Sequence, residues 1–404
     1  MNVDKMAVQQ LQKYFQDKSR VKGEFSNEEL ARQRAFTIRY KSLENLDKQL
    51  LEFESHFSKH QGKLIWAPKS DWAFKEIKEL AGPKVYTRQH RLLHEIGLLD
   101  SKPSGWTYFD ESYFRYNPDN PSFPEWQDAQ AGQKQIAARP QPDKDSCAIL
   151  FPEFYISENG SLLLANNDPY VNALLNTCKR IIFIVGIEQV CPTMADSEYF
   201  LSLLGKYRFG KSEFNDYTFV SPGNSQRELH PQTEMHVVML DNGRTDILGH
   251  IPERQSLYCI QCGACKQESN HLVLNSSKPA IIDAIKQALV EGSQEKHWQA
   301  LFDFPLSGRA SQDCPVNVDL KGLLLHMRQL AVTGKHAPRG ESYAWIAWKK
   351  AMMSRKWLNK GAQIKNFTLK SFFKKSWGEQ REFPKITDKS FNDWWLETRG
   401  KEEA

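Results

Sequence analysis

The chain has 404 residues, a length that suggests two or three compact units. Hydrophobic residues make up 40% of it, and 22 glycines bring the apolar share into the ordinary globular range, which argues against wholesale disorder. The formal net charge is +5, too small for a chain of this length to indicate a dedicated nucleic-acid-binding protein.

The hydrophobic segments are too short to cross a membrane. The longest strongly apolar run, Ile181 to Ile187, has seven residues, whereas a membrane-spanning helix needs about 20. The first 20 residues alternate charged and apolar side chains and lack the apolar stretch of a secretory signal. We therefore expect no transmembrane segment and predict a cytoplasmic location with reduced thiols.

Residues 1–60 are predicted as a helical N-terminal segment, because apolar residues recur there at the helical period between charged ones. From Lys63 onward, short apolar runs alternate with polar helical stretches, a pattern that favours an α/β layer structure. The strand-like runs are KLIWA (63–67), KVYT (84–87), SCAILF (146–151), SLLLA (161–165), RIIFIVGI (180–187), YTFVS (217–221) and MHVVMLD (235–241). The run 180–187 is apolar on both faces, as expected of a central strand. Between them, residues 101–145 show no clear period and are predicted as a long surface loop.

Three regions follow from these patterns after the N-terminal segment. Residues 61–253 are predicted as the α/β domain. Residues 254–334 hold clustered cysteines and two helical stretches, 279–292 and 318–332. Residues 335–404 are rich in basic and aromatic side chains, which could contact RNA or an anionic membrane, or pack as amphipathic helices against the rest of the protein or a partner.

The seven cysteines divide into two groups. Cys147, Cys178 and Cys191 are scattered in or beside apolar segments and are predicted to be buried, inert thiols. The other group consists of Cys259, Cys262 and Cys265, spaced C-x2-C-x2-C, and the more distant Cys314. In a reducing compartment such crowding points to metal or redox chemistry rather than to disulfides.

The spacing follows the bacterial ferredoxin pattern, in which three cysteines of one run and the last, proline-flanked cysteine of another hold one [4Fe–4S] cluster. Here those four positions are Cys259, Cys262, Cys265 and Cys314, and Pro315 follows the last of them. The positions that would hold a second cluster are Ser269, Ser307 and Ala310. The pattern therefore predicts one complete cluster site and the loss of a whole second site.

Two other interpretations of the four cysteines remain open. Four thiolates can hold a structural zinc ion, and zinc sites occur in proteins without a redox role. Zinc sites usually pair their cysteines two and two, so the division into three and one followed by Cys-Pro favours iron–sulfur. The third interpretation is that the cysteines bind no metal.

Several strings together resemble the lactate-utilization protein B family, iron–sulfur proteins that join a lactate-utilization (LUD) domain to a ferredoxin-like dicluster module. The strings are ENGSLLLANN, RIIFIVGIEQVCPTMADSEYFLSLL, ELHPQTEMHVVMLDNGRTDIL, CIQCGAC, CPVNVDLKGLLLHMR and REFPKITDKSFNDWW. Their order and spacing cover most of the chain. Family members carry two clusters, so this chain resembles a divergent member that has lost one of them.

The resemblance implies a NagB/RpiA/CoA-transferase-like LUD domain over residues 61–253 and an α-helical ferredoxin-like module over 254–334. It implies an electron-transfer subunit of a complex that oxidises L-lactate, rather than an enzyme acting alone. The cysteine pattern predicts one [4Fe–4S] cluster for this chain, on Cys259, Cys262, Cys265 and Cys314. The expected partners are a second LUD protein and a cysteine-rich oxidoreductase subunit, with no nucleic acid. The alternative function is a scaffold subunit whose cluster or zinc ion is structural. A third, weaker possibility, by analogy with its fold relatives, is that the LUD domain is itself an enzyme acting on a small carboxylate or acyl-CoA. No catalytic residue is assigned, since no nucleophile with an obvious base is found.

Two further candidates have simple structural explanations. His90 and His94 would share a face of a helix as two metal ligands can, but no third ligand is evident, which favours a structural role. Glu158 precedes a turn at Asn159 and Gly160, where it could face a ligand or be solvated.

Overall fold

The computed structural model describes most of residues 27–334 and isolated positions beyond them. The described ranges are 27–101, 103–109, 140–165, 169–209, 214, 217–222, 233–265, 280–290 and 294–334, followed by scattered residues between 336 and 398. The chain divides into two compact units, residues 1–331 and residues 332–404. The predictions for residues 1–26, and for most of residues 335–404, therefore fall outside the described part.

A six-stranded parallel sheet forms the centre of the first unit, so the prediction of an α/β structure is confirmed. Its strand order is β1-β10-β7-β4-β2-β3, and every neighbouring pair is parallel. The strands are β1 (Lys63–Ala67), β2 (Val85–Arg88), β3 (Trp106–Phe109), β4 (Cys147–Leu150), β7 (Arg180–Gly186) and β10 (Glu234–Leu240). The run predicted as a central strand is β7, which lies between β10 and β4 and is buried from its second residue onward.

Strand β3 corrects the prediction of an irregular segment over residues 101–145. It pairs along its whole length with β2 at the edge of the sheet. Its four residues, WTYF, are a short stretch, and three of them are only partly buried. Pairing with β2, rather than local hydrophobicity, defines the strand. Residues 110–139 lie outside the described part.

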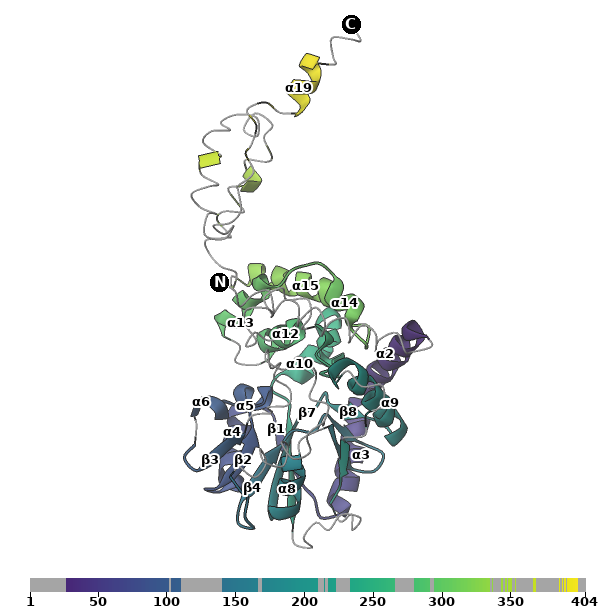
Figure 1. The fold of residues 1–404 in the computed structure, drawn as a ribbon, viewed down its shortest axis with the longest axis vertical. Coiled ribbons are helices and arrows are strands. Elements are labelled where there is room, and N and C mark those ends of the chain that lie inside the picture. Colours follow the sequence, from purple (N-terminus) through teal and green to yellow (C-terminus); the bar gives the residue numbers. More distant parts are fainter. Residues whose placement is uncertain are drawn as a thin grey trace, which may run out of the picture. The chain divides into compact units, whose positions relative to one another are not determined.

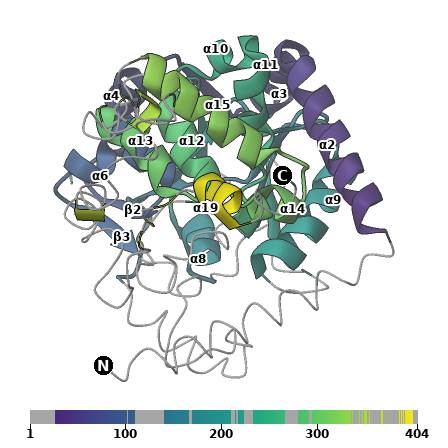
Figure 2. The same cartoon turned by 90° about the horizontal axis from the view of Figure 1, so that it is seen from above.

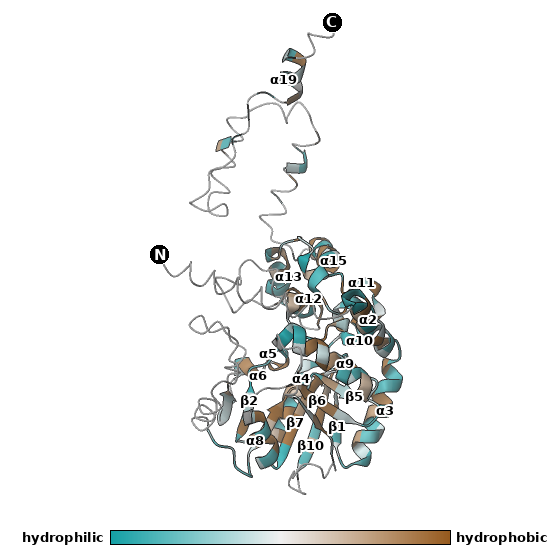
Figure 3. Ribbon diagram, turned by 45° about the vertical axis from the view of Figure 1, so that its right-hand side comes forward, coloured by the Kyte–Doolittle hydropathy of each residue, from teal (hydrophilic) through white to brown (hydrophobic). Residues whose placement is uncertain are grey.

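Alternate side chains of the sheet pack into two cores. On one face, Ile182 and Ile184 of β7 pack with the helices that follow β1 and β2. On the other, Ile181, Phe183 and Val185 belong to a larger core that extends to the C-terminal helices of the unit. The helices of the first face are α4 (Ser70–Ala81), α5 (Arg91–Ile96) and α6 (Leu98–Ser101). Figure 3 shows the hydrophobic strands enclosed by helices whose outer surfaces are hydrophilic.

A smaller, four-stranded sheet lies against the larger core. Its order is β8-β5-β6-β9, with β5 parallel to β8 and antiparallel to β6. The elements on this side are β5 (Phe154–Ile156), β6 (Ser161–Ala165), β8 (Val190–Cys191), β9 (Tyr217–Val220), α8 (Pro169–Thr177) and α9 (Met194–Leu204), which continues as a π-helix over Gly205–Phe209. The sheet adds a second β layer that the sequence patterns did not separate from the first.

Two N-terminal helices, α2 (Glu28–Glu44) and α3 (Leu46–Lys59), confirm the helical prediction for the described part of that segment. Asn27 caps α2, because its side-chain oxygen accepts a hydrogen bond from the Leu30 backbone N–H. Phe53 and Phe57 of α3 are fully buried, and Phe53 meets the ring of Tyr155 on β5 at 4.9 Å. Helix α3 is therefore part of the core.

The remaining helices of the first unit gather over the carboxyl ends of the parallel strands, as Figures 1 and 2 show. They are α10 (Arg244–Gly249), α11 (Ile251–Arg254), a 3-10 turn (Gln255–Tyr258), α12 (Ile281–Leu289), α13 (Glu295–Ala300), a second 3-10 turn (Leu301–Asp303), α14 (Arg309–Asp313) and α15 (Leu320–Thr333). The predicted cysteine-bearing region is thus helical and shares the larger core with the sheet.

In the second unit, the structure describes one longer helix, α19 (Phe391–Thr398). Its aromatic residues Phe391, Trp394 and Trp395 are exposed. The ring centroid of Phe391 lies 5.8 Å from that of Trp394 and 5.9 Å from that of Trp395. Across the described residues of both units, every helix is too short or too polar to cross a lipid bilayer.

Candidate functional site

The first three predicted cysteines lie on a tightly curled loop that follows the 3-10 turn ending at Tyr258. Gln261 and Gly263 both have positive φ angles, 59° and 75°, which bend the backbone around the sulfurs. A left-handed conformation is uncommon for a residue such as glutamine. The Gln261 backbone N–H donates a hydrogen bond of 3.3 Å to Cys259 Sγ, so the strained residue also supplies a donor to one of the thiols.

Cys314 ends helix α14 and is surrounded by backbone donors. Burial raises its pKa to about 11, against the effect of the Val318 and Val316 backbone N–H groups, which hydrogen-bond to the sulfur. Asn317 between them has a positive φ of 51°, which allows both amides to face the same atom. Pro315 has no N–H, so the following residues provide the donors.

Arg32 of α2 holds this second loop in place. Its Nε donates to the Cys314 carbonyl at 2.9 Å, and its Nη2 donates to the Ser311 carbonyl at 3.0 Å. Helix α2 therefore positions Cys314 from a point 282 residues earlier in the chain.

The four predicted cysteines lie within electrostatic range of one another. Burial raises the pKa of Cys265 well above its usual value, and Cys259, Cys262 and Cys314 raise it further. Cys314 also interacts with Cys259. Cys262, Cys265 and Cys314 are each 9% exposed or less. The protein thus buries three thiols and half-buries a fourth in one region of its core.

The positions expected for a second cluster do not gather thiols. Ala310 is buried in the core and Ser307 lies in the turn before α14, where its hydroxyl accepts a hydrogen bond from the Arg309 backbone N–H. Ser269 lies outside the described residues. Within the described part of the chain, which includes all four predicted cluster cysteines, no group of three or more His, Cys, Asp or Glu side chains is arranged so that it could hold a metal ion.

A fully buried arginine, Arg39 of α2, lies beside the cysteine loop. It donates hydrogen bonds to four carbonyls, those of Tyr258, Leu257, Val190 and Glu188, at 2.5 to 3.2 Å. Burial lowers its pKa, while Cys191, Glu188 and Cys259 act in the opposite direction. Arg39 therefore ties the turn that precedes Cys259 to the segment that follows β7.

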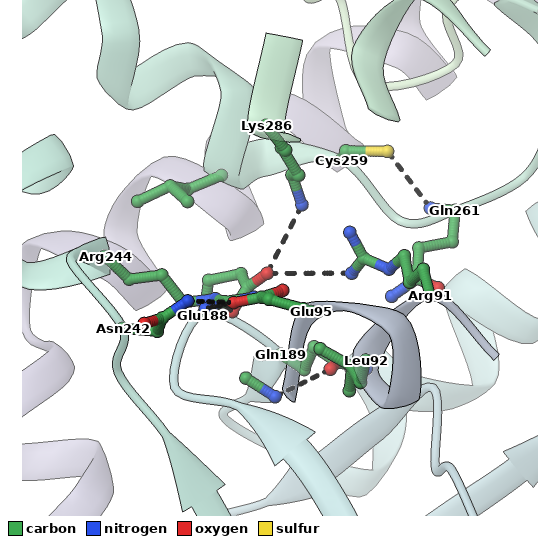
Figure 4. A network of polar contacts seen from close by, with 12 residues as sticks. Arg91, Leu92, Glu95, Glu188, Gln189, Asn242, Arg244, Cys259, Gln261 and Lys286 are labelled. Carbon is green, nitrogen blue, oxygen red and sulfur yellow. Dashed lines mark hydrogen bonds and ion pairs between the residues drawn. The ribbon is translucent and has the colours of Figure 1, made fainter. Parts of the chain in front are cut away.

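Glu188, two residues beyond β7, is the centre of a buried ionic network (Figure 4). Its Oε2 accepts from Arg244 Nε at 2.7 Å, and its Oε1 lies 3.3 Å from Lys286 Nζ and 3.7 Å from Arg91 Nη2. Burial acts to raise the pKa of Glu188, but Arg244, Lys286 and Arg91 outweigh it and hold the pKa far below the usual range. The carboxylate is therefore ionised although it is 1% exposed.

Glu95 of α5 extends this network. Arg244 Nη1 and Nη2 donate to its two oxygens at 2.7 and 2.9 Å, and Asn242 Nδ2 donates to Oε1 at 2.8 Å. The network thus joins residues that follow β2, β7 and β10 to Lys286 of α12. Lys286 also interacts electrostatically with Cys259, so the network connects the carboxyl edge of the sheet to the cysteine loop.

The sequence patterns did not indicate this network. The relevant signal was present, since polar residues directly after buried parallel strands line the edge where α/β proteins bind ligands. Glu188 and Arg244 occupy such positions in GIEQ and DNGR. Their partners lie 56 to 149 residues apart, which no local pattern reveals.

The remaining residues considered in the sequence, two histidines, Glu158 and the three scattered cysteines, lie outside the cysteine loop and the ionic network. His90 Nδ1 accepts from the Leu92 N–H at the start of α5, and its ring stacks on Phe151 at 4.1 Å, while His94 is exposed. Exposed Glu158 accepts from the Met194 N–H at 2.8 Å, at the start of α9. Cys147, Cys178 and Cys191 are buried as predicted, and burial raises the pKa of Cys147 and Cys178 to about 12.

A small pocket opens where β2 and β4 end. Its lining residues are Arg88, Leu150, Phe151, Glu153, Leu164, Ala165 and Val171. Glu153 pairs with Arg208 at 2.8 Å and also accepts from the Ala165 N–H. The carboxyl ends of neighbouring parallel strands therefore carry both a pocket and the ionic network.

Comparison with known proteins assigns the domain. Residues 50–240, which contain the parallel sheet and the smaller sheet, match the LUD domain family. The chain is therefore a LUD-domain protein.

Longer relatives define the family more closely. The chain is 26% identical to lactate utilization protein B of Bacillus cytotoxicus over 93% of its own length and 89% of the relative's. It is 25% identical to lactate utilization protein B of Bacillus thuringiensis over 92% and 89% of the two chains. Both relatives align with most of this chain, so the similarity to lactate utilization protein B extends well beyond the LUD domain.

Among solved structures, the chain is similar to a DUF162 family protein from Deinococcus radiodurans. The sequence identity is 13% and the TM-score is 0.32, over 48% of this chain and 98% of that one.

Proposed function

We propose that this protein takes part in lactate utilization as an electron-transfer subunit, with one [4Fe–4S] cluster on Cys259, Cys262, Cys265 and Cys314. Support for the lactate role comes from the curated relatives, which align with more than nine tenths of the chain. The observation that carries the cluster proposal is that Cys262, Cys265 and Cys314 lie in one buried core against which Cys259 packs, although Cys314 is 49 residues further along the chain than Cys265.

The chain supplies the number and type of donors that an iron–sulfur cube requires, four cysteine thiols. Four thiolates hold such a cluster, one at each iron, so they surround it without converging on a single point. Backbone N–H groups already reach the sulfurs of Cys259 and Cys314, and hydrogen bonds of this kind stabilise thiolates and adjust a cluster's potential. A bound cluster would supply one-electron transfer at this position.

The charges around the cysteines favour an anionic group. Buried thiols resist ionisation, and burial raises the pKa values of Cys265 and Cys314, so a metal centre is needed to keep them as thiolates. Arg39 and Lys286 both interact with Cys259. Buried Arg39 beside the thiols would offset part of the negative charge of a cluster in its thiolate cage.

We further propose that the protein carries a single cluster, since Ser307 and Ala310 occupy two of the positions that a second cluster would need. The LUD domain would have a NagB/RpiA/CoA-transferase-like fold, and the helices after residue 254 would form a ferredoxin-like module. Electrons would pass to or from partner subunits, a second LUD protein and a cysteine-rich oxidoreductase subunit, where L-lactate oxidation takes place.

Anaerobic purification followed by iron and acid-labile sulfide analysis tests the proposal. We expect about four irons and four sulfides per chain. Cys314→Ser should lower both strongly, whereas Cys178→Ala, which removes a buried thiol away from the proposed site, should leave them unchanged. Zinc without sulfide would overturn the iron–sulfur proposal, and about eight irons would overturn the single-cluster proposal.

Electron paramagnetic resonance separates electron transfer from a structural role. A cluster that carries electrons should accept one from dithionite and return it on oxidation without loss of iron. A cluster that cannot be reduced reversibly would favour a scaffold subunit.

A further inference from the structure

Arg91, the first residue of α5, presents an open guanidinium edge. Its Nε and Nη2 are buried, and neither has a hydrogen-bond partner among the described residues. These two nitrogens form the fork that receives both oxygens of a carboxylate in a bidentate pair. The nearest carboxylate oxygen, Glu188 Oε1, is 3.7 Å from Nη2, too far for a hydrogen bond. Buried donors of this kind call for a water or a ligand.

Lys286 faces the same place from α12, as Figure 4 shows. Its side chain is 6% exposed, and its ammonium reaches Glu188 Oε1 at 3.3 Å. An ammonium carries three donors, so this contact leaves capacity for a second acceptor. Arg91 is close enough to lower the Lys286 pKa, second only to burial. The two cations thus repel each other across Glu188.

The ionic network contains more positive than negative groups. Its ion pairs join three cations, Arg91, Arg244 and Lys286, to two carboxylates, Glu95 and Glu188. The five groups therefore carry one net positive charge. An uncompensated charge in a protein interior is costly, and a singly charged anion between Arg91 and Lys286 would neutralise it.

The topology of the sheet points to the same location. From β2 the chain continues outward to β3, whereas from β4 it continues to β7 and β10 on the other side. The carboxyl ends of β2 and β4 therefore form the switch point at which open α/β sheets bind ligands. Arg91 follows β2 by three residues and Glu188 follows β7 by two, so they face each other across the end of β4.

We propose that Arg91 and Lys286 bind a small monocarboxylate anion at this switch point, next to the cysteine loop. The Arg91 fork receives the two carboxylate oxygens, and the Lys286 ammonium donates to one of them. A carboxylate fits better than a phosphate dianion, because a single negative charge neutralises the network whereas two would reverse its sign beside Glu188. This proposal concerns binding by the LUD domain and does not depend on the cluster.

Calorimetric titration of the full chain with acetate, pyruvate and inorganic phosphate tests the proposal. We expect acetate or pyruvate to bind with a stoichiometry of one, more tightly than phosphate. Arg91→Lys keeps the charge but removes the fork, and it should weaken carboxylate binding at least tenfold. Lys286→Met should weaken it by a similar factor. Arg309→Lys, the matched change at an exposed arginine, should leave binding unchanged.

Circular dichroism spectra and thermal melting of each variant show whether it is folded. If Lys286→Met fails to fold, the comparison rests on Arg91→Lys, which preserves the network charge. The proposal is overturned if neither carboxylate binds, since water then occupies the Arg91 fork. It is also overturned if phosphate binds more tightly than both carboxylates, or if folded Arg91→Lys binds them as tightly as the original protein.

Discussion

Glu188 shows how a single residue can link stability to pH. Its usual pKa in an unfolded chain is about 4.3, and Arg244, Lys286 and Arg91 hold its pKa far lower in the folded protein against the opposing effect of burial. Between these two values the unfolded chain binds a proton that the folded protein does not. The stabilisation from the ion pairs is therefore complete above about pH 4.3 and is lost as the pH falls below it.

Glu188→Gln should remove this pH dependence while lowering stability at neutral pH. The variant leaves the buried cations without their shared carboxylate, a change that costs about 3–5 kcal/mol for a buried ion pair. Below about pH 4.3, its free energy of unfolding should fall less steeply than that of the original protein, by up to about 1.4 kcal/mol per pH unit. Urea unfolding between pH 3 and pH 7 measures both effects.

The matched control for this comparison is Glu52→Gln on α3, whose carboxylate is exposed. It should change the free energy of unfolding by less than about 0.5 kcal/mol across the same range. Parallel pH profiles for the original protein and Glu188→Gln would show that Glu188 is not held ionised in the folded state.

Individual residues show what could and could not be predicted from the sequence. Arg39 is one of the charged residues that separate the apolar residues of the predicted N-terminal helix, yet its side chain is 0% exposed. The spacing of three cysteines and the Cys-Pro dipeptide did identify four thiols that the fold brings within electrostatic range, because three of them are neighbours in sequence. The cluster itself stays a prediction. The ionic network was missed because its members are distant along the chain.

At the scale of elements, the end of β7 shapes the site. A Cβ atom on Gly186 would lie 2.0 Å from Glu188 Oε2 and 2.8 Å from Arg244 Nε. Glycine is needed there for space, so that the Glu188 side chain can fold back over the strand end toward Arg244. The absence of a side chain at Gly186, the last residue of β7, therefore determines where the Glu188 carboxylate can lie.

Gly186→Ala should therefore displace the Glu188 carboxylate and destabilise the protein by about 1–3 kcal/mol, the usual cost of overpacking a tight core. Urea unfolding at pH 7 measures the loss. Gly249→Ala at the end of α10 is the control, because a Cβ there would meet no atom within 4 Å. A neutral result for Gly186→Ala would mean that the network adjusts without strain.

The elements themselves differ in how well the sequence predicts them. Strands β7 and β10 were predicted because central parallel strands are apolar on both faces, and β1, although it lies at an edge, was predicted from the apolar run KLIWA. Strand β3 was missed because it lies at an edge, is only partly buried along most of its length, and is followed by polar, proline-rich sequence. The separate four-stranded sheet was missed because local patterns indicate strands but not which sheet they join.

For the whole molecule, the continuity of the larger core governs how the first unit unfolds. The same cluster of buried residues contains Phe183 and Val237 of the sheet and Leu324 and Met327 of α15. Residues 1–331 also form one compact unit. The LUD domain and the cysteine-bearing helices are therefore expected to unfold together rather than one after the other.

Hydrogen exchange followed by mass spectrometry tests this expectation. In moderate urea, amides of β7 and α15 should become exposed with the same free energy of opening. Amides of α19, in the other unit, should exchange much earlier, because an eight-residue helix with exposed side chains is marginal by itself. Exchange of α15 well before β7 would show two independently stable parts.

The contacts of Arg39 have a consequence for biosynthesis. Helix α2 leaves the ribosome early, but the four carbonyls that receive its guanidinium lie 149 to 219 residues later in the chain. At translation rates of about 5–20 residues per second, the last of them follows after roughly 10–40 s. Helix α2 therefore cannot complete its native contacts until the turn before Cys259 has been synthesised, so the N-terminal part of the fold is finished only when more than half of the chain exists.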